Sequence, residues 1–165
     1  MKRFRRLELL APLGATICNL LMAYATYFLA RIAFLVVNFG YFEQGLTWSH
    51  LMEMMGGGLV FDTSAILVTN IPYILLMLLP FHKDTHAYRQ VCRWVFIVIN
   101  SLALAANLCD AVYFKYTMRR TTTTVFQEFS NENNLLSIFF SEAMHNVILI
   151  LFFGLVVYAV YMLYA

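Results

Sequence analysis

The side chains that could do chemistry in this chain lie near the ends of long apolar stretches. Arg31 lies close to the end of the first stretch, Asp62 close to the start of the second, and Asp110 at the end of the third. An ionised group inside a bilayer is energetically costly, so such groups persist mainly where they are paired or hydrated. These residues therefore predict either ion pairs or a polar pocket, and both require helices that bring them together.

No complete active site is visible in the sequence. The chain contains no GxSxG, HExxH, P-loop or dinucleotide-binding motif, and no paired carboxylates accompany a nucleophile. Its histidines are scattered along the chain and its three cysteines form no CxxC pair. We therefore expect no catalytic residue, no metal ligand, no cofactor and no disulfide in this chain, and we interpret the cysteines as small buried thiols.

The elements that must position the charged residues are four apolar segments, at residues 9–37, 59–81, 91–112 and 147–165. A helix rises about 1.5 Å per residue, so each segment can cross a hydrocarbon core of about 30 Å. The composition agrees, because 62% of the residues are hydrophobic, 12% are charged and the mean hydropathy is +0.72. The sequence predicts an all-α fold, a polytopic membrane bundle with four transmembrane helices.

The distribution of basic residues predicts the orientation of this bundle. Seven precede the first segment or lie around the loop between the second and third, against three after the third: Lys2, Arg3, Arg5, Arg6, Lys83, Arg89 and Arg93, against Lys115, Arg119 and Arg120. Because cytoplasmic loops carry the excess of Lys and Arg, we expect a cytoplasmic N-terminus and outward loops at 38–58 and 113–146. A net charge of +2, spread in this way, argues against nucleic acid as a partner.

Both outward loops are predicted to form amphipathic helices on the membrane surface. Residues 46–55 combine Trp48 and methionines with charged side chains, and the glycines 56–58 are expected to allow a sharp turn into the second span. Residues 117–142 place apolar side chains at roughly helical spacing between polar ones. Inside the second span, Asn70 and Pro72 predict a kink whose freed backbone groups are satisfied locally.

The charged ends of the spans are predicted to meet at one depth. Arg31 lies about 33 Å along a helix that starts at Leu9, at the outward end where the second span starts and the third ends. The inference is a polar pocket at the outer leaflet, formed by a lower and an upper group: Arg31, Asp62, Asn107 and Asp110 below, and Lys115, Arg119 and Arg120 above. The alternative is purely structural, because Arg31 paired with Asp62 or Asp110 would already satisfy both charges.

Several short blocks of the sequence resemble one protein family. They are Gly57 to Ala65, Asn70 to Pro72, Asn100 to Leu104, Asn107 to Asp110, Tyr113-Phe114 and Arg119 to Thr122. In order and spacing they resemble the N-terminal membrane domain of the lipoteichoic acid synthase-like, or sulfatase-like, phosphoglycerol transferases of the alkaline phosphatase superfamily, in the form common in Bacteroidota. The resemblance covers residues 56–129 and includes no catalytic signature.

The resemblance implies a division of labour between two domains. In this family about five membrane helices precede a large extracytoplasmic domain, where a threonine nucleophile and a divalent metal, commonly manganese or zinc, carry the transfer. This chain offers four spans and lacks that expected downstream domain, so the nucleophile and the metal ligands have no counterpart here. The implied function is that of a membrane anchor and lipid-donor-binding module in the bacterial inner membrane, whose partner is its own or a separate catalytic domain.

The same resemblance implies that the outer pocket binds the headgroup of a membrane phospholipid. Arginine and lysine suit phosphate, because a guanidinium offers a planar fork of donors and an ammonium a compact charge. Arg119 and Arg120 are the first candidates for this contact. The other contributors would be Lys115, Arg31, Asp62, Asn107 and Asp110. The transferred group would be phosphoglycerol or phosphoethanolamine, and both remain open.

A second interpretation belongs to a different class, a free-standing four-helix membrane scaffold or a small transport protein without catalysis. A transporter is expected to carry polar residues near mid-membrane and a repeat between its halves. In this sequence the ionisable residues gather at the outer end of the spans and no repeat is visible. The sequence therefore favours the transferase module. A third interpretation is a relative that has lost its catalytic part and retains lipid binding.

Overall fold

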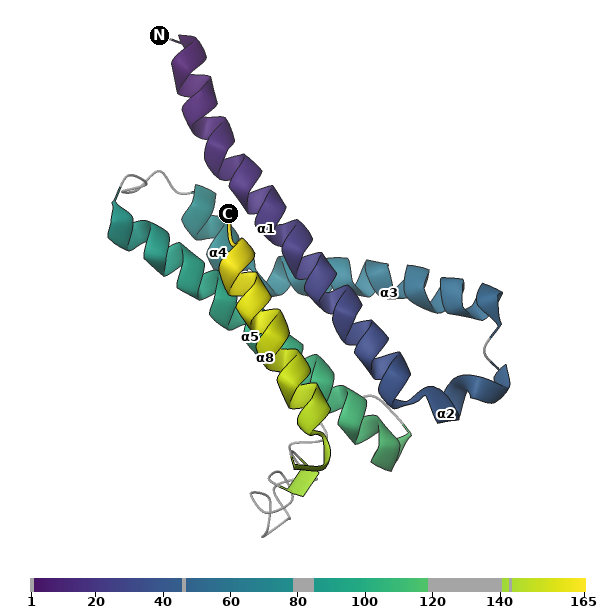
Figure 1. The fold of residues 1–165 in the computed structure, drawn as a ribbon. Helices are drawn as coiled ribbons and strands as arrows, with labels where there is room; N and C mark the ends of the chain where they lie inside the picture. Colours follow the sequence, from purple (N-terminus) through teal and green to yellow (C-terminus); the bar gives the residue numbers. More distant parts are fainter. Residues whose placement is uncertain (1, 46, 79–84, 119–140, 143) are drawn as a thin grey trace.

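The computed structural model describes residues 2–45, 47–78, 85–118, 141–142 and 144–165, and within these ranges it contains helices and no strand (Figure 1). The helices are α1 Lys2–Val37, α2 Phe39–Phe42, the 3₁₀-helix η1 Glu43–Gly45, α3 Trp48–Thr69, α4 Ile71–Leu78, α5 His86–Thr117 and α8 Val147–Leu163. For these residues the predicted all-α class is confirmed.

Helix α5 is the element on which the others assemble. Helices α1, α4 and α8 all pack against it. In Figure 1, α1 and α5 run in the same direction and α8 runs antiparallel to them. Helix α3 crosses α1 steeply, so that its N-terminal half reaches away from the bundle. We call the end where α5 begins and α8 finishes the N-terminal end, and the end where α1 and α5 finish the loop end.

Three helices are long and apolar enough to cross a membrane, at Pro12–Val37, Trp48–Thr69 and His86–Tyr116. Helix α8 is also apolar but has 17 residues. At the usual helical rise it spans about 26 Å, slightly less than a typical hydrocarbon core. By their length and composition, these helices suggest a membrane protein. Of the four predicted spans, three are long enough to cross a membrane, and the fourth is a shorter apolar helix, so four spans are not confirmed.

The second span differs from the prediction in its boundaries. A separate interfacial segment at 46–55 followed by a span at 59–81 is expected from the sequence, whereas α3 runs without a break from Trp48 to Thr69 and includes Gly56, Gly57 and Gly58. The expected sharp turn at these glycines is therefore wrong. Each glycine costs a helix about 1 kcal/mol relative to alanine, but breaking the helix in lipid would leave backbone groups unpaired at a higher cost.

The predicted kink in the second span is confirmed, and it lies at Asn70, between α3 and α4. Pro72 has no backbone N–H, so the helical hydrogen-bond ladder cannot continue through it. The backbone N–H of Asn70 and its side-chain Nδ2 both donate to the carbonyl oxygen of Ile66 at 3.0 Å. The end of α3 is thus satisfied locally. The other predicted interfacial segment, at 117–142, lies almost entirely outside the described residues.

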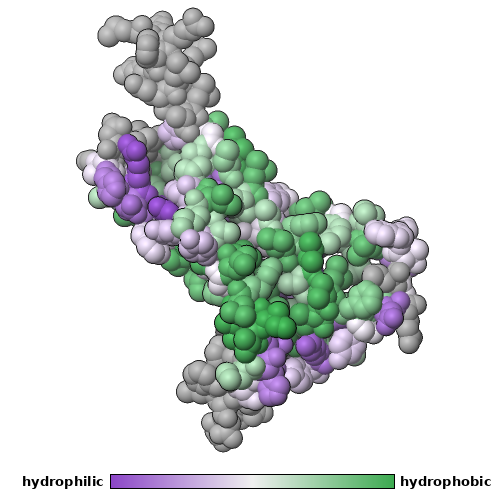
Figure 2. All heavy atoms as spheres, viewed as in Figure 1, coloured by the Kyte–Doolittle hydropathy of each residue, from purple (hydrophilic) through white to green (hydrophobic). Residues whose placement is uncertain are grey.

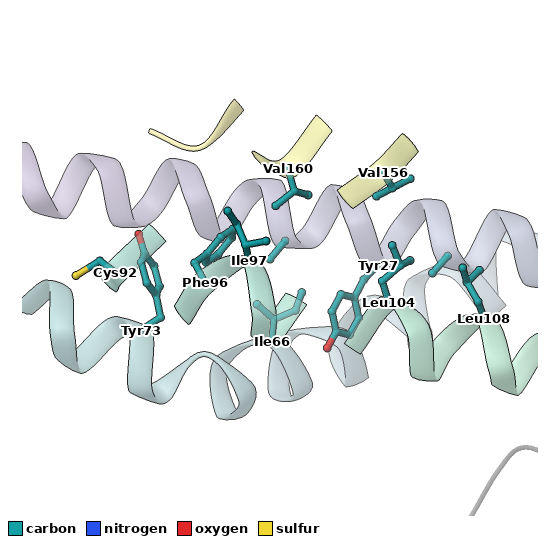
Figure 3. Packing of buried hydrophobic residues seen from close by; sticks show 12 residues of the cluster. Tyr27, Ile66, Tyr73, Cys92, Phe96, Ile97, Leu104, Leu108, Val156 and Val160 are labelled. Atoms are coloured by element: carbon teal, nitrogen blue, oxygen red, sulfur yellow. The ribbon is translucent and has the colours of Figure 1, made fainter. Parts of the chain in front are cut away.

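The core lies where α1, α4, α5 and α8 meet (Figure 3). Tyr73 on α4 and Phe96 on α5 are fully buried and their ring centroids are 4.9 Å apart. Aromatic pairs at this separation contribute about 0.5–1.5 kcal/mol beyond the area they bury. Val156 and Val160 of α8 close the cluster from the other side. This packing fixes the helices that carry the polar residues described below.

The outer surface of the bundle is apolar. Large side chains such as Leu21 and Phe61 are 61% and 77% exposed, and Figure 2 shows hydrophobic residues over the middle of the molecule with hydrophilic residues towards its ends. An apolar surface of this kind suits contact with lipid. Cys92 is buried, whereas Cys18 and Cys109 are exposed. The prediction of buried thiols is therefore wrong for two cysteines, because their helix faces point outward rather than into the core.

Candidate functional site

Arg31 of α1 and Asp62 of α3 form a bidentate ion pair. Arg31 Nε donates to Asp62 Oδ2 at 2.6 Å, and Arg31 Nη2 donates to Asp62 Oδ1 at 2.7 Å. The two side chains are 18% and 12% exposed, so they are largely shielded. Two parallel hydrogen bonds between a guanidinium and a carboxylate are the strongest geometry for such a pair. Two of the predicted site residues are thus brought together.

Gly58 makes room for the Arg31 guanidinium. Arg31 Nη2 donates to the carbonyl oxygen of Gly58 at 2.7 Å, and a Cβ atom at this position would overlap Nη1 and Cζ of Arg31. Gly57, one residue earlier, faces open space. Because Gly58 and Asp62 are four residues apart, they share one face of α3. That face supplies both the carboxylate and a backbone oxygen that the guanidinium can reach.

This ion pair decides which charges remain for a ligand. Asp62 neutralises Arg31 and Gly58 accepts a third hydrogen bond from it. A phosphate that bound Arg31 through these donors would have to displace Asp62 or Gly58. The structural alternative raised by the sequence, in which Arg31 and a carboxylate satisfy each other, is the arrangement observed for Arg31 and Asp62.

The loop end holds a second polar contact, between α1 and α5. Asn38, just after α1, is fully buried and donates from Nδ2 to the carbonyl oxygen of Ala111 at 2.9 Å. Asp110 precedes Ala111 and therefore lies close to the level of Asn38. Arg31 is seven residues earlier in the chain, about 10 Å further from the loop end. The predicted site residues thus occupy two levels, with the Arg31–Asp62 pair deeper and Asp110 nearer the loop end.

The other described site residues lie on the last turns of α5. Asn107 donates from Nδ2 to the carbonyl oxygen of Ala103 in its own helix at 2.9 Å. Lys115 lies in the final turn of α5, where a cation is favoured by the helix dipole. Asp110 is partly buried between them. The predicted residues Arg119 and Arg120 lie outside the described residues.

Four aromatic rings pack together at the loop end. The centroids of Phe34, Tyr41 and Phe42 lie 5.1, 6.2 and 5.7 Å from that of Phe114, and Phe42 stacks on Phe114. These contacts hold α2 against α5 beside Lys115. From the sequence alone, no role is predicted for residues 39–42. Their aromatic content is the signal that could have indicated packing here.

An open hollow of about 500 Å³ lies between α2, η1 and the start of α3. Its walls are formed by Tyr41, Phe42, Gly45, His50, Glu53 and Met54. The Nδ1 atom of His50 lies 3.1 Å from the carbonyl oxygen of Gly45. The hollow combines aromatic faces with a carboxylate and an imidazole, so it suits a group with both polar and apolar parts. From the sequence, an interfacial helix is predicted here, but none of these residues is predicted to form a site.

Two asparagines form a buried polar pair where α3, α4 and α5 meet. Asn100 Nδ2 donates to Asn70 Oδ1 at 2.9 Å, and Asn70 Nδ2 lies 3.4 Å from Asn100 Oδ1. Asn100 Nδ2 also donates to the carbonyl oxygen of Phe96 at 2.8 Å. From the sequence, Asn70 is predicted only as part of a kink. An amide side chain in each of two apolar spans is the sequence signal that could have indicated this pair. In the structure, the pair links the kink at Asn70 to α5.

Neither a metal site nor a known relative identifies the protein further. Among the described residues, no group of three or more His, Cys, Asp or Glu side chains could hold a metal ion. The chain matches no known protein family, no curated protein and no solved structure. The fold and the site therefore define a helical membrane protein with an internal ion pair and a polar loop end, and its function has to be argued from these residues.

Proposed function

We propose that this chain is the membrane anchor and lipid-donor-binding module of an extracytoplasmic transferase that moves a phosphoglycerol or phosphoethanolamine headgroup to an acceptor. The sequence blocks that resemble the lipoteichoic acid synthase-like family support the reaction class. The observation that carries the proposal is the gathering of Arg31, Asp62, Asp110 and Lys115 in the half of the bundle next to the loop end, beside the hollow that contains Glu53.

In this proposal Lys115 binds the lipid phosphate. Its ammonium is a compact charge in the last turn of α5, at the loop end of the bundle. Arg119 and Arg120 follow within five residues of it and add two guanidinium groups to the same stretch of chain. Asn107 and Asp110 lie on the same helix within three turns and would accept hydrogen bonds from headgroup hydroxyls or orient the cations.

Arg31 takes a positioning role in this proposal. Because Asp62 and Gly58 accept three hydrogen bonds from its guanidinium, Arg31 holds α3 against α1. Helix α3 carries Glu53 and His50, which line the hollow. The headgroup would enter the hollow while the acyl chains lie along the exposed apolar faces of the bundle.

The transfer reaction is proposed to take place in a catalytic domain outside this chain. The family resemblance implies a threonine nucleophile and manganese or zinc there, and it places no such group on the residues described here. If the chain lies in a bacterial inner membrane with its N-terminus on the cytoplasmic side, the loop end faces outward. The chain would then present the donor phosphodiester to the catalytic domain above it.

Binding of defined lipids to the full chain in nanodiscs tests the proposal. The Arg119→Gln/Arg120→Gln double variant should bind phosphatidylglycerol about tenfold or more weakly, because charge-assisted hydrogen bonds are worth about 1.5–3 kcal/mol each. The Arg5→Gln/Arg6→Gln double variant removes the same charge before the first span and serves as the matched control. Equal affinity of the two variants and the wild type would contradict the proposal.

A scaffold is the second candidate, and one observation favours it. The N-terminal half of α3 reaches away from the bundle (Figure 1), and the helix exposes Trp48 in that half and Val60 and Phe61 just beyond it, by 77%, 69% and 77%. An apolar helix face without a neighbour could accept a helix of a partner protein. The nanodisc experiment separates the candidates, because a scaffold would show no lipid affinity that depends on Arg119 or Arg120.

A further inference from the structure

Arg93 is held between α5 and α8 at the N-terminal end of the bundle. Its Nη2 donates to the carbonyl oxygen of Tyr161 at 2.6 Å, and its guanidinium carbon lies 4.0 Å from the centroid of the Tyr161 ring. The Tyr161 carbonyl is among the last of α8, where carbonyls have no partner within the helix. The position of Arg93 is therefore fixed by one hydrogen bond and one cation–π contact, and its guanidinium retains further donors.

Arg89 lies one turn before Arg93 on the same face of α5 and is exposed. Two cations four residues apart repel each other, and Arg89 lies in the first turn of α5, where the helix dipole also disfavours positive charge. Within the described parts of the chain, the ion pair present is Arg31–Asp62, so no described carboxylate neutralises this pair of arginines. An anion bound here would relieve both kinds of repulsion.

The first turn of α5 offers further donors to such an anion. The helix begins at His86, and its N-cap residue Thr85 makes no side-chain capping hydrogen bond. The first backbone N–H groups of a helix have no partner within the helix and point towards its N-terminus, which suits phosphate groups. Arg89 and Arg93 thus lie in the first two turns, at the open end of a 32-residue helix.

Aromatic residues mark this place as the level of lipid headgroups. Trp94 and Tyr161 are 53% and 38% exposed, and their ring centroids are 6.2 Å apart. Trp and Tyr concentrate where the hydrocarbon core meets the headgroups. An anion available at this level of a membrane is the phosphate of a phospholipid.

We propose that Arg89 and Arg93, together with the first turn of α5, bind the phosphate of an anionic phospholipid at the N-terminal end of the bundle. This site lies at the opposite end from the one in the proposed function and does not depend on it. A net negative lipid such as phosphatidylglycerol is preferred over zwitterionic phosphatidylcholine, because two positive charges are to be neutralised. The bound lipid would tie α5 to α8 through Arg93.

Fluorescence quenching of Trp94 tests this site directly. The chain has two tryptophans, so the Trp48→Phe variant leaves Trp94 as the reporter beside Arg93. In nanodiscs, quenching by phosphatidylglycerol that carries a nitroxide at acyl carbon 5 is compared with quenching by the same label on phosphatidylcholine. We expect about tenfold selectivity for the anionic lipid, as for one or two charge-assisted hydrogen bonds.

The variants decide whether Arg89 carries the selectivity. In Arg89→Gln, the ratio of quenching by labelled phosphatidylglycerol to quenching by labelled phosphatidylcholine at Trp94 should fall close to one. Lys115→Gln, which removes one charge at the other end of the bundle, should retain the wild-type ratio. Arg93→Lys keeps the charge but loses the planar fork, and an intermediate preference is expected. Absence of selectivity in the wild type, equal loss in Arg89→Gln and Lys115→Gln, or full displacement of the labelled lipid by millimolar inorganic phosphate would each overturn the proposal.

The second tryptophan, Trp48, serves to test the two proposed lipid sites independently. In the Trp94→Phe variant, Trp48 at the start of α3 reports on the loop end. Quenching at Trp48 that responds to Lys115→Gln concerns the proposed headgroup site, and quenching at Trp94 that responds to Arg89→Gln concerns this one. Failure of either response leaves the other result intact.

Discussion

Arg31 and Asp62 are joined by two parallel hydrogen bonds of 2.6 and 2.7 Å that tie α1 to α3 inside the apolar part of the bundle. The pair is possible because α3 crosses α1 at Gly58, where the absence of a side chain admits the guanidinium. The same crossing directs the N-terminal half of α3 away from the other helices (Figure 1). This ion pair balances the charges of the deeper polar level and fixes α3 to α1 at the point where the two helices cross.

Removing one partner of this pair should destabilise the protein strongly. Arg31→Leu or Asp62→Leu leaves a shielded charge without its partner, which costs about 3–5 kcal/mol in comparable buried pairs. The Arg31→Leu/Asp62→Leu double variant should recover most of this loss, because no unpaired charge remains. The free energy of unfolding in mixed detergent micelles, followed by circular dichroism, measures the effect. Additive losses in the double variant would show that the two residues do not act as a pair.

Gly58 and Gly57 should respond in opposite ways to alanine. Gly57→Ala faces open space and should stabilise α3 by up to about 1 kcal/mol through helix propensity. Gly58→Ala displaces the Arg31 guanidinium and weakens its hydrogen bonds, so a net loss of about 1–2 kcal/mol is expected. Unfolding of the two variants under identical conditions measures the difference. In an Arg31→Leu background the loss at position 58 should disappear, and its persistence would contradict this account.

Asn70 and Asn100 should be energetically coupled. Their amides bond to each other, and hydrogen bonds between membrane helices contribute about 0.6 kcal/mol on average and up to about 1.7 kcal/mol. A double-mutant cycle with Asn70→Leu and Asn100→Leu should give a coupling energy within this range. Two isolated losses that simply add would mean that each amide serves only its own helix, through Ile66 and Phe96 respectively.

The sequence predicted the features that depend on local pattern. Apolar length indicated the helical membrane class, and Asn70 with Pro72 indicated the kink, because both follow from backbone hydrogen bonding alone. It also named Asp62 as one possible partner for Arg31. The choice between Asp62 and Asp110 could not be made from spacing, because it depends on the crossing of α3 over α1 at Gly58.

Other features depend on which helix faces meet, and these could not be predicted from the sequence. The continuous course of α3 through its glycines follows from the cost of unpaired backbone in lipid, which outweighs glycine's low helix propensity. The hollow beside Glu53 requires α2 to be anchored on Phe114, a contact between distant segments. The pairing of Asn70 with Asn100 likewise requires two helices to be placed first.

The orientation of the bundle is the last prediction, and accessible cysteines test it. The three native cysteines are replaced by alanine, and Ser49→Cys or Thr85→Cys is introduced, both at exposed positions. Because basic residues concentrate around the N-terminus and the start of α5, that end should remain in the cytoplasm. A membrane-impermeant maleimide added to intact bacterial cells without an outer membrane should label the Ser49→Cys variant, and the Thr85→Cys variant only after permeabilisation. The reverse pattern would place Lys115 and the hollow in the cytoplasm, where an extracytoplasmic transferase could not receive a donor lipid from them.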